Sequence, residues 1–454
     1  MTSPSLEFLP LGGTGEIGMN LNLYATQGRW LMVDAGVMFE RTQGGGMRVL
    51  YPDPSFIVRK RDKLDGLVLT HAHQDHLGAV ADLWPDLRCT VYATPFAAAM
   101  LEGPLIERGL HGTVPIRVID EDARFRVGPF DLQRIPLTHS TVEMGALVVR
   151  AAGTTVLHTG DFKLDPDPVV GRHFRDDVLR KLGDDGVDVV VSDSTNADHE
   201  GWTGSEGALA APLLRVLRNQ PGRIAVTLFS SNIARVQTLA DAAHALGRDL
   251  IFVGRSLERT VRAAQKCGYL DELPAVVPFR HYGFLPPERV MLLCTGSQGE
   301  LRAGLSRIAA NDHPHVYLEP GDTAVFSARA IPGNELALAR LHMLFAERGV
   351  EVVTADQHPV HVSGHPRRDE LRTLYGWLQP SYVLPVHGTP PKLEAHAELA
   401  EAMGLGALRL MNGQRVRLGP GTPERLRPVR TGRLERVEQG WGRRRQRPRH
   451  RGRP

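Results

Sequence analysis

The stretch His71-Ala72-His73-Gln74-Asp75-His76 constrains this chain more than any other part of its sequence. It follows the apolar run 67–70, which predicts a strand, and side chains alternate along a strand, so His71 and His73 point to the same side. The turn that follows can bring Asp75 and His76 to a second metal beside the first. Imidazole and carboxylate groups suit zinc or manganese. The pattern therefore predicts a dinuclear metallohydrolase site, and the alternative is a polar turn with surface histidines.

Length and composition exclude several classes of protein. The chain has 454 residues, of which 42% are hydrophobic and 23% charged, which predicts two soluble domains and a tail. The sequence has no run of about 18 apolar residues and no basic-then-apolar N-terminal segment, so we expect neither a membrane span nor a secretory signal. The three cysteines, Cys89, Cys267 and Cys294, form no C-x-x-C pair. This usage indicates a reducing cytoplasm and no thiolate zinc knuckle.

The net charge of +3 hides a strongly basic C-terminal stretch. Between Arg425 and Pro454 twelve arginines face two glutamates, a net charge of +10 that leaves −7 for residues 1–424. Because no apolar period survives there, we expect residues 425–454 to form a disordered Arg-rich tail. The run from Arg443 to Arg453 fits non-specific attraction to RNA phosphates, and a solvated extension is the alternative.

Residues Leu6 to Gly36 predict a β-hairpin followed by a further strand. The hairpin turn, Gly13-Thr14-Gly15-Glu16-Ile17-Gly18, matches the G-x-G-x-x-G dinucleotide pattern, which requires a helix to follow. A period-two strand follows instead, so we reject a dinucleotide site. The strand Trp30–Val33 ends at Asp34, which is placed either to steady a metal-bound histidine or to end a hairpin.

Polar side chains that could complete the metal sites recur at the ends of later strands. His139 follows the strand at 134–138, and Asp161 follows the strand at 155–160. From about Glu206 helices and strands alternate, which predicts a parallel α/β sheet inserted into the first domain. Histidines at strand ends then reappear, where the chain would return to the first domain: His358, His361, His365 and His387.

Six motifs resemble the ribonuclease J family, in the β-CASP branch of the metallo-β-lactamase superfamily. They fall in order between about residues 7 and 418, at 12–18, 158–163, 193–197, 294–300, 331–335 and 361–365. The resemblance implies an α/β fold, a metallo-β-lactamase αββα sandwich with an inserted β-CASP α/β domain. We expect the first part of the sandwich at residues 1–206, the β-CASP domain at 207–358, the return segment at 359–424 and the tail at 425–454.

The resemblance also implies a role for each candidate site residue. One divalent metal would be held by His71, His73 and His139, the other by Asp75, His76 and His387, with Asp161 bridging the two. We expect Zn²⁺, with Mn²⁺ or Mg²⁺ as alternatives. The catalytic residues would be Asp75, Asp193 and His365. We hypothesise that His365, oriented by Asp193, protonates the departing 3′-oxygen, and the alternative is a structural hydrogen bond. Thr389 stands where family members usually carry Glu.

Candidate RNA-binding residues lie in loops of the inserted domain and of the return segment. Ser230, Ser231 and Asn232 precede one helix, and Arg255 and Ser256 begin another, where backbone N–H groups can hold phosphate. Ordinary helix capping is the alternative. By resemblance, a pocket for the 5′-phosphate of RNA would be lined by His361, Ser363, Gly364 and His365.

The expected function is a metal-dependent 5′→3′ exoribonuclease, with endonuclease activity also open, in RNA decay and maturation in the cytoplasm. The expected partner is single-stranded, 5′-monophosphorylated RNA. A small-molecule hydrolase and a non-catalytic RNA-binding subunit are the alternatives, and the large inserted domain and the full set of seven metal ligands argue against them. Family members usually continue into a C-terminal domain that aids oligomerisation, whereas an Arg-rich stretch follows here, so we carry over no homo-oligomeric state.

Overall fold

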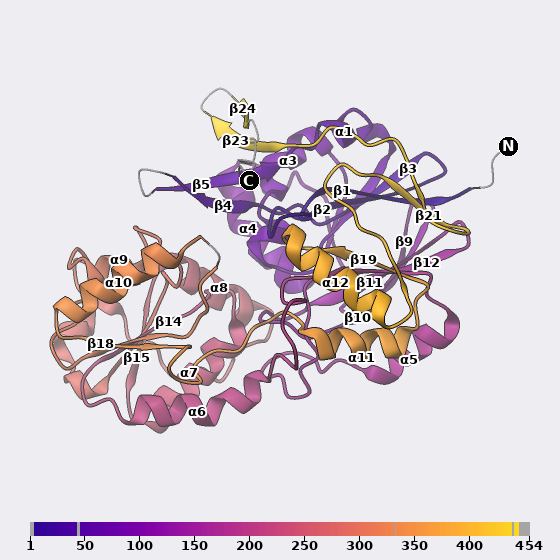
Figure 1. Cartoon of the computed structure of the whole chain (residues 1–454). Coiled ribbons are helices and arrows are strands. Elements are labelled where there is room, and N and C mark those ends of the chain that lie inside the picture. Colours follow the sequence, from indigo (N-terminus) through magenta and orange to yellow (C-terminus); the bar gives the residue numbers. More distant parts are fainter. Residues whose placement is uncertain (1–3, 43–45, 332, 438–439, 445–454) are drawn as a thin grey trace, which may run out of the picture.

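The computed structural model describes residues 4–42, 46–331, 333–437 and 440–444, which form two lobes (Figure 1). One lobe contains two large mixed sheets, and the other contains a parallel sheet of five strands. The second lobe is formed by consecutive residues in the middle of the chain, so it interrupts the first.

The first sheet of the larger lobe has the order β22-β21-β1-β2-β3-β6-β7-β8. Its strands are β1 (Leu6–Gly12), β2 (Leu21–Thr26), β3 (Arg29–Val33), β6 (Leu64–Val68), β7 (Val91–Ala93), β8 (Ile116–Val118), β21 (Val416–Gly419) and β22 (Glu424–Arg425). β1 and β2 form the predicted antiparallel hairpin, in which Leu9 lies opposite Leu23. A strand and not a helix follows the glycine-rich turn, which confirms that the turn lacks the context of a dinucleotide site.

The second sheet has the order β20-β19-β13-β12-β11-β10-β9. Its strands are β9 (Arg124–Val127), β10 (Phe130–Pro136), β11 (Gly145–Ala151), β12 (Thr154–His158), β13 (Val189–Asp193), β19 (Tyr382–Val386) and β20 (Gly406–Ala407). β13 precedes the insertion and pairs in parallel with β19, which follows it. β21 likewise returns to the first sheet beside β1. The return segment therefore completes both sheets.

Helices cover the outer faces of both sheets. Between the sheets lies a buried apolar cluster that includes Phe8, Leu31, Leu147 and Val191. The second sheet is covered by α5 (Asp176–Asp185), α11 (Arg368–Leu378) and α12 (Pro390–Ala402), and the first by α1 (Ser55–Val58), α3 (Val80–Leu87) and α4 (Pro95–Glu107). Two short helical turns, η1 (Arg61–Lys63) and α2 (Gln74–Leu77), complete this lobe. The layers confirm the expected αββα sandwich.

The inserted domain alternates strands and helices as its sequence predicts. Its strands are β14 (Ile224–Thr227), β15 (Asp249–Val253), β16 (Val290–Cys294), β17 (Thr323–Phe326) and β18 (Glu351–Thr354), in the order β15-β16-β14-β17-β18. Its helices are α6 (Glu206–Arg218), α7 (Ile233–Ala245), α8 (Arg255–Lys266), η2 (Phe279–Phe284), η3 (Pro287–Arg289), α9 (Gly304–Ala309) and α10 (Glu335–Glu347). The Ser205 side chain caps α6 by accepting from two backbone N–H groups.

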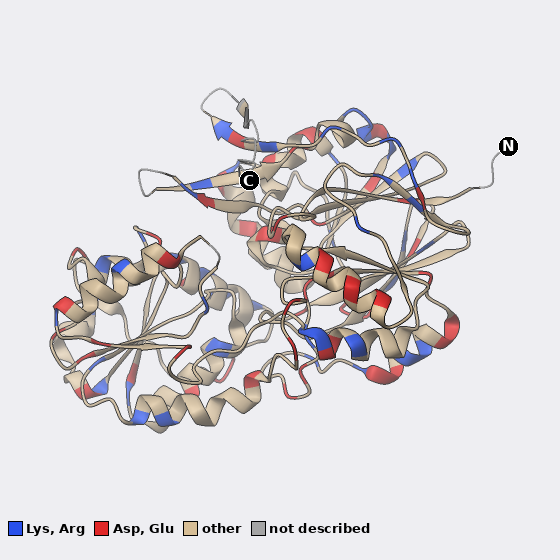
Figure 2. Ribbon diagram, viewed as in Figure 1, with Lys and Arg blue, Asp and Glu red and all other residues tan. Residues whose placement is uncertain are grey.

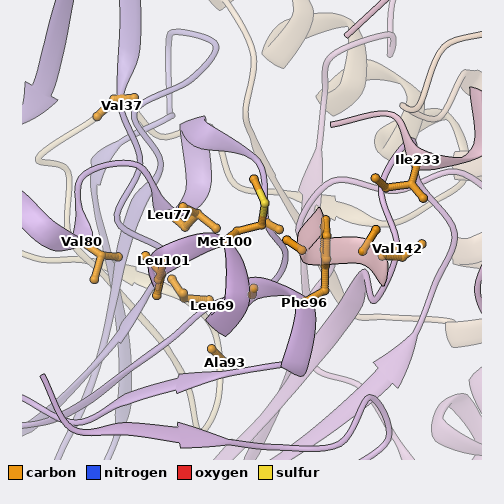
Figure 3. Close-up of a cluster of buried hydrophobic side chains, with 14 of the residues drawn as sticks. Val37, Leu69, Leu77, Val80, Ala93, Phe96, Met100, Leu101, Val142 and Ile233 are labelled. Carbon is orange, nitrogen blue, oxygen red and sulfur yellow. The ribbon is translucent and has the colours of Figure 1, made fainter. Parts of the chain in front are cut away.

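Contacts between the lobes come from several elements. Figure 3 shows Ile233 of α7 near Val142 of the sandwich, within one continuous apolar core. Across the junction, Lys266 of α8 lies 2.9 Å from Glu102 of α4. Arg41 donates from Nη2 to the Gly299 carbonyl at 3.0 Å. These contacts hold the edge of the parallel sheet over the sandwich.

The expectation of disorder from Arg425 onward was wrong for much of that stretch. β23 (Arg433–Val437) and β24 (Gly440–Arg444) extend a small sheet formed by β4 (Met38–Arg41) and β5 (Met47–Pro52). Leu434 is buried, and the Trp441 ring packs edge-on against Tyr51 at a centroid distance of 5.0 Å. The pairing with β5 supplies the order, and the sparse apolar residues among the arginines did not indicate it. Residues 445–454 lie outside the described residues.

Charged residues of both signs are distributed over both lobes, and acidic residues recur along α12 (Figure 2). Among the described residues, no helix has the length and apolar character that crossing a membrane requires.

Candidate active site and metal centre

The histidine motif lies in the turn between β6 and α2, and a buried network fixes the turn. Arg134 donates to the carbonyl groups of Leu69 and Thr70 at 2.9 and 3.1 Å. Asp34 accepts from the Thr70 backbone N–H at 2.8 Å and lies 2.9 Å from Thr70 Oγ1. Because Thr70 Oγ1 donates to Asp34, it accepts from Nδ1 of His71, 2.9 Å away. This chain of hydrogen bonds leaves Nε2 of His71 as the ring atom without a proton.

One cluster of candidate ligands brings together the ends of three strands. His71, His73, His139 and Asp161 each offer a ligand atom within 4.8 Å of the others. His139 follows β10, and its Nδ1 donates to the Gly364 carbonyl at 2.6 Å. That bond fixes the tautomer and turns Nε2 toward His73, 3.1 Å away.

A second cluster lies beside the first and shares Asp161 with it. Asp75, His76, Asp161 and His387 again offer ligand atoms within 4.8 Å of one another. His76 donates from Nδ1 to Asp34 at 2.8 Å, and its Nε2 lies 3.1 Å from Asp161. Nδ1 of His387 lies 3.0 Å from Asp161. Asp34 therefore holds the His76 ring directly, which agrees with the first of the two roles that the sequence suggested for Asp34.

The positions of both Asp34 and His387 require an unusual backbone conformation. Their φ angles are +63° and +50°, in the left-handed region. Asp and His tolerate this region better than most residues do, and non-glycine residues in it gather at functional sites. The local conformation points both side chains into the cluster rather than along the sheet.

Two buried ring nitrogens are available to bind a divalent cation. Nε2 of His71 and Nε2 of His73 have no hydrogen-bond partner among the described residues, although both atoms are buried. Buried polar atoms are almost always paired, because an unpaired one costs about 1–3 kcal/mol. Two such atoms beside a carboxylate form the donor set that a divalent metal requires.

The charge states of these groups also suit metal binding. Burial, followed by the neighbouring imidazoles, lowers the pKa of His71, and burial lowers the pKa of His73 to about 4. Burial likewise lowers the pKa of His139, so all three rings are neutral, as ligands must be. Burial alone would raise the pKa of Asp161, but the nearby His387 and His76 outweigh it and lower that pKa.

A third group of side chains lies at the edge of the second cluster. His365 Nδ1 lies 2.7 Å from Oδ2 of Asp193, which is the last residue of β13. Thr195 donates to the other carboxylate oxygen from both its backbone N–H and its hydroxyl, at 2.8 and 2.7 Å. Burial alone would lower the pKa of His365, but Asp193 outweighs it and raises that pKa. His365 is thus oriented by Asp193 and biased toward its protonated form.

The predicted RNA-binding residues of the inserted domain differ in how accessible they are. Asn232 is buried, its side chain accepts from the Arg235 backbone N–H at 2.9 Å, and its own N–H donates to Phe229. Asn232 therefore caps α7, as the capping alternative predicts. Ser230 and Ser231 are partly exposed in the same loop. Arg255 is exposed at the start of α8.

The residues of the predicted phosphate pocket lie beside the third group. Nδ1 of His361 is buried without a partner in the described part of the chain, and burial lowers the pKa of this ring to about 3. Ser363 Oγ accepts from the Asn196 amide at 3.0 Å and from the His365 N–H at 3.2 Å. The Gly364 carbonyl orients His139, a role that sequence reasoning did not assign.

Several supporting residues escaped the sequence reasoning. Asn20 Nδ2 lies 3.0 Å from Nε2 of His76, and Thr195 Oγ1 lies 3.1 Å from Nδ1 of His387. Lys392, in the first turn of α12, donates to the Thr195 carbonyl at 2.6 Å. Thr195 follows Asp193 within a recognised motif, so its proximity was a usable signal. Asn20 carried no comparable signal, since polar residues alternate along many strands.

Together, the two stacked sheets, the strand-end cluster and the inserted parallel sheet define a hydrolase of the metallo-β-lactamase fold with a β-CASP domain. Three family models match the chain in series: "Beta-lactamase superfamily domain" at residues 29–218, "Ribonuclease J, beta-CASP domain" at 221–343 and "Zn-dependent metallo-hydrolase RNA specificity domain" at 335–409. The chain belongs to the ribonuclease J family.

Relatives support this placement over nearly the whole chain. Ribonuclease J of Sinorhizobium meliloti is 41% identical over 94% of this chain and 77% of its own length. Ribonuclease J of Mycolicibacterium smegmatis is 38% identical over 88% of this chain and 72% of its own length. A solved protein of unknown function from Enterococcus faecalis matches the fold with a TM-score of 0.62 at 14% identity, over 91% of this chain and 100% of its own. The family and the inserted domain support a metal-dependent ribonuclease.

Proposed function

We propose that this chain hydrolyses phosphodiester bonds of single-stranded, 5′-monophosphorylated RNA in the 5′→3′ direction at a dinuclear metal centre. The observation that carries the proposal is the convergence of seven side chains into two clusters that share Asp161, with Nε2 of His71 and His73 unpaired. A small-molecule hydrolase needs no inserted domain of this size, and a non-catalytic subunit needs no complete ligand set.

One metal would be held by His71, His73 and His139 and the other by Asp75, His76 and His387, with Asp161 between them. The neutral rings of His71, His73 and His139 and the ionised carboxylates of Asp75 and Asp161 favour Zn²⁺, with Mn²⁺ or Mg²⁺ as alternatives. When bound, such ions lower the pKa of water and neutralise charge that develops on phosphoryl oxygens. Asp34, Thr70 and the Gly364 carbonyl hold the ligand rings in their orientations.

His365 would supply the proton that the leaving group requires. Asp193 accepts from Nδ1 of His365, which leaves the proton on Nε2 directed away from the carboxylate. The raised pKa of His365 favours the protonated ring that a general acid requires. We propose that Nε2 donates it to the departing 3′-oxygen. Asp193 is then a positioning residue.

His361, Ser363 and Gly364 would receive the 5′-phosphate. The neutral His361 ring can donate one hydrogen bond to a phosphate oxygen, and its buried Nδ1 has no partner among the described residues. A pocket of this kind anchors the first nucleotide, so that cleavage proceeds from the 5′ end. The free cysteines Cys89, Cys267 and Cys294 suit a reducing cytoplasm, where RNA decay and maturation take place.

We also propose that the β-CASP domain extends from residue 207 to 358 and that the return segment extends from 359 to 424. The first boundary falls at the start of α6, whereas one family match ends at residue 218 and the next begins at 221, just after this helix. β19 and β21 lie within the proposed return segment.

A time course on 3′-labelled RNA tests the function directly. Metal-stripped protein should be inactive, and protein reconstituted with Zn²⁺ or Mn²⁺ should release mononucleotides from 5′-monophosphorylated RNA. A 5′-hydroxyl RNA of the same sequence should be degraded more slowly. Internal fragments without mononucleotides would identify an endonuclease, and equal rates on both RNAs would refute the proposed 5′-phosphate pocket.

A further inference from the structure

A hollow of about 1010 Å³ opens on the inserted domain outside the catalytic clusters. We name it the α8 cleft, and the residues that define it are Arg255, Arg259, Arg262, Phe279, Arg302 and His315. It lies at the carboxyl ends of β15 and β16, where Gly254 and Thr295 follow those strands. In parallel α/β sheets, ligands bind at this edge of the sheet.

The cleft presents positive charge that the protein itself does not neutralise. Arg255, Arg259 and Arg262 occupy one face of α8, because they are spaced by four and three residues. The side chains of Arg255, Arg262 and Arg302 are exposed and make no hydrogen bond or ion pair within the described part of the chain. Arg259 lies 3.8 Å from Glu107, and its buried Nε has no partner among the residues described. Unpaired guanidinium groups of this kind suit phosphate.

Carboxylates in the cleft do not cancel this charge. Its lining has five arginines and three glutamates. Glu107 pairs with Arg259, and Glu300 accepts from the Gln298 backbone N–H at 3.1 Å. The remaining glutamate, Glu258, lies on α8 among the arginines. Arg307 pairs with Asp312, 3.7 Å away. Arg255, Arg262 and Arg302 therefore carry the positive charge that remains open to an anionic ligand.

An exposed aromatic ring stands beside these arginines. The Phe279 side chain is 39% exposed, and its ring lies 5.5 Å from the ring of His315 and 6.2 Å from that of His313. An apolar ring held at the surface next to cations is the arrangement on which nucleobases stack in single-strand-binding proteins. The combination indicates a ligand that carries both bases and phosphates.

The cleft and the catalytic clusters lie at the same edge of the parallel sheet. The loop after β17 reaches the catalytic side, where Ser327 Oγ donates to the Val360 carbonyl at 2.7 Å, next to His361. β15 and β16 lie at the other side of β14 in the same sheet. Neighbouring strands are about 4.8 Å apart, so the cleft is only a few strand widths from that loop.

We propose that the α8 cleft binds a segment of the single-stranded RNA substrate away from the scissile bond, with phosphates on Arg262 and Arg302 and a base on Phe279. This inference rests on RNA being the substrate. The cleft holds the body of a long RNA, whereas the catalytic clusters act on its end. Binding at the cleft therefore contributes to affinity for long RNA and not to the cleavage of short RNA.

The test compares the double variant Arg262→Glu/Arg302→Glu with the control Arg218→Glu/Arg340→Glu, which changes the same charge on exposed helix positions elsewhere in the domain. Fluorescence anisotropy measures the Kd of the metal-loaded protein for a cleavage-resistant phosphorothioate RNA of about 24 nucleotides. This RNA is longer than the sites of about 4–16 nucleotides that single-strand-binding domains occupy. We expect the cleft variant to bind at least about tenfold more weakly. The slope of log Kd against log salt should fall by about 1.4, or 0.7 for each lost phosphate contact.

Phe279→Ala separates stacking from charge. It should weaken binding of the long RNA at least about fivefold while leaving the salt slope unchanged, since a ring releases no counterions. Phe284→Ala is its control, because Phe284 is more exposed, at 86%, and does not line the cleft. For each variant, kcat/KM on an RNA of about four nucleotides should equal that of the wild type.

Each remaining outcome is informative. Equal Kd values for the cleft variant and its charge control would overturn the proposal. Loss of short-RNA cleavage in the cleft variant alone would also overturn it, because the cleft would then belong to the active site. Full displacement of the long RNA by millimolar AMP would assign the cleft to free nucleotides instead. If the wild-type protein binds long RNA but cleaves no RNA at all, the proposed function fails while the binding comparison remains valid.

Discussion

His365 and Asp193 lie 172 positions apart in the sequence, yet Nδ1 of the imidazole is 2.7 Å from Oδ2 of the carboxylate. Asp193 ends the last strand before the insertion, and His365 belongs to the segment that returns after it. The pair therefore links the segments on the two sides of the inserted domain. It places His365 beside the clusters, although neither proposed metal needs this side chain as a ligand.

Replacing His365 with Ala should reduce kcat on RNA by about 10²- to 10⁴-fold, since general acid catalysis contributes that much. Bound metal, measured by inductively coupled plasma mass spectrometry, should be unchanged. His244→Ala, at an exposed histidine of α7, is the matched control and should retain full activity. Loss of a metal ion from the His365 variant would instead identify this residue as a ligand.

Removal of a candidate metal ligand should lower the number of metal ions that the protein binds. His71→Ala deletes one of the two unpaired buried nitrogens, and the number of bound ions should fall from about two per chain to one or none. Chelation of the wild-type protein should lower its Tm, because an ion that binds only the folded state stabilises it. An unchanged stoichiometry of two in the variant would refute the ligand assignment.

Gly364→Ala tests how the protein orients His139. A Cβ atom at this position would lie 2.7 Å from both Cε1 and Nδ1 of the His139 ring, so the carbonyl and the ring must move apart. We expect metal affinity to fall about 10- to 100-fold, the usual effect of removing a partner of a ligating histidine. Gly283→Ala, where an added Cβ meets nothing within 4 Å, should leave affinity unchanged.

His396 should make folding stability depend on pH. Burial, and then Arg368, lowers the pKa of this ring to about 3 from its ordinary value of 6.5, although Asp193 opposes the shift. Below pH 6.5 the unfolded chain binds a proton that the folded chain excludes, so stability falls as the pH falls from 6.5 toward 3. The slope from this one group is at most about 1.4 kcal/mol per pH unit.

Urea unfolding of His396→Gln at several pH values measures this effect. The variant should show a smaller loss of unfolding free energy between pH 7 and pH 5 than the wild type, and its stability at pH 7 should be lower, because the ring contacts Ser194 and Tyr375. His281→Gln, at an exposed position, should keep the wild-type slope. Parallel wild-type and His396→Gln profiles would show that another group dominates in this range.

Two truncations separate the structural and electrostatic roles of the C-terminal stretch. Ending the chain at Glu424 removes β23 and β24, including the buried Leu434, and exposes Tyr51, so Tm should fall by several degrees. Ending it at Arg444 removes five arginines but keeps both strands, so Tm should be unchanged. If the arginines attract RNA, the second truncation should weaken RNA binding most at low salt. Unchanged affinity at low salt would assign the solvated-extension alternative.

Much of the fold and site could be predicted because the informative residues stand at strand ends. His71, His139 and Asp161 each follow a strand whose apolar residues are visible in the sequence. These strands are β6 of the first sheet and β10 and β12 of the second, and their ends meet at one edge of the sandwich. The ordered motifs supplied the remaining connection, which is that residues beyond the insertion return to the same edge. No local pattern could show that His387 meets Asp75, because that contact depends on the register of two sheets.

The features that the sequence left undecided or did not indicate have physical causes of the same kind. Asn232 carries the signal of a loop that could bind phosphate, and the same signal fits a helix cap, so only its burial beside Arg235 distinguishes the two. The strand at 433–437 has few apolar residues, and its order comes from backbone pairing with β5, which sequence periodicity does not encode. Gly364 orients His139 through its backbone carbonyl. Because every residue has a carbonyl group, the sequence carries no signal for this role.

The position of the insertion has a consequence for synthesis of the protein. The ribosome synthesises the chain from its N-terminus, so six of the seven candidate metal ligands emerge before the inserted domain does. His365 and the seventh ligand, His387, emerge after it. A nascent chain that stops before residue 359 therefore lacks both. Such a chain can form neither the complete second cluster nor the His365–Asp193 pair, so the proposed nuclease activity depends on synthesis having passed the inserted domain.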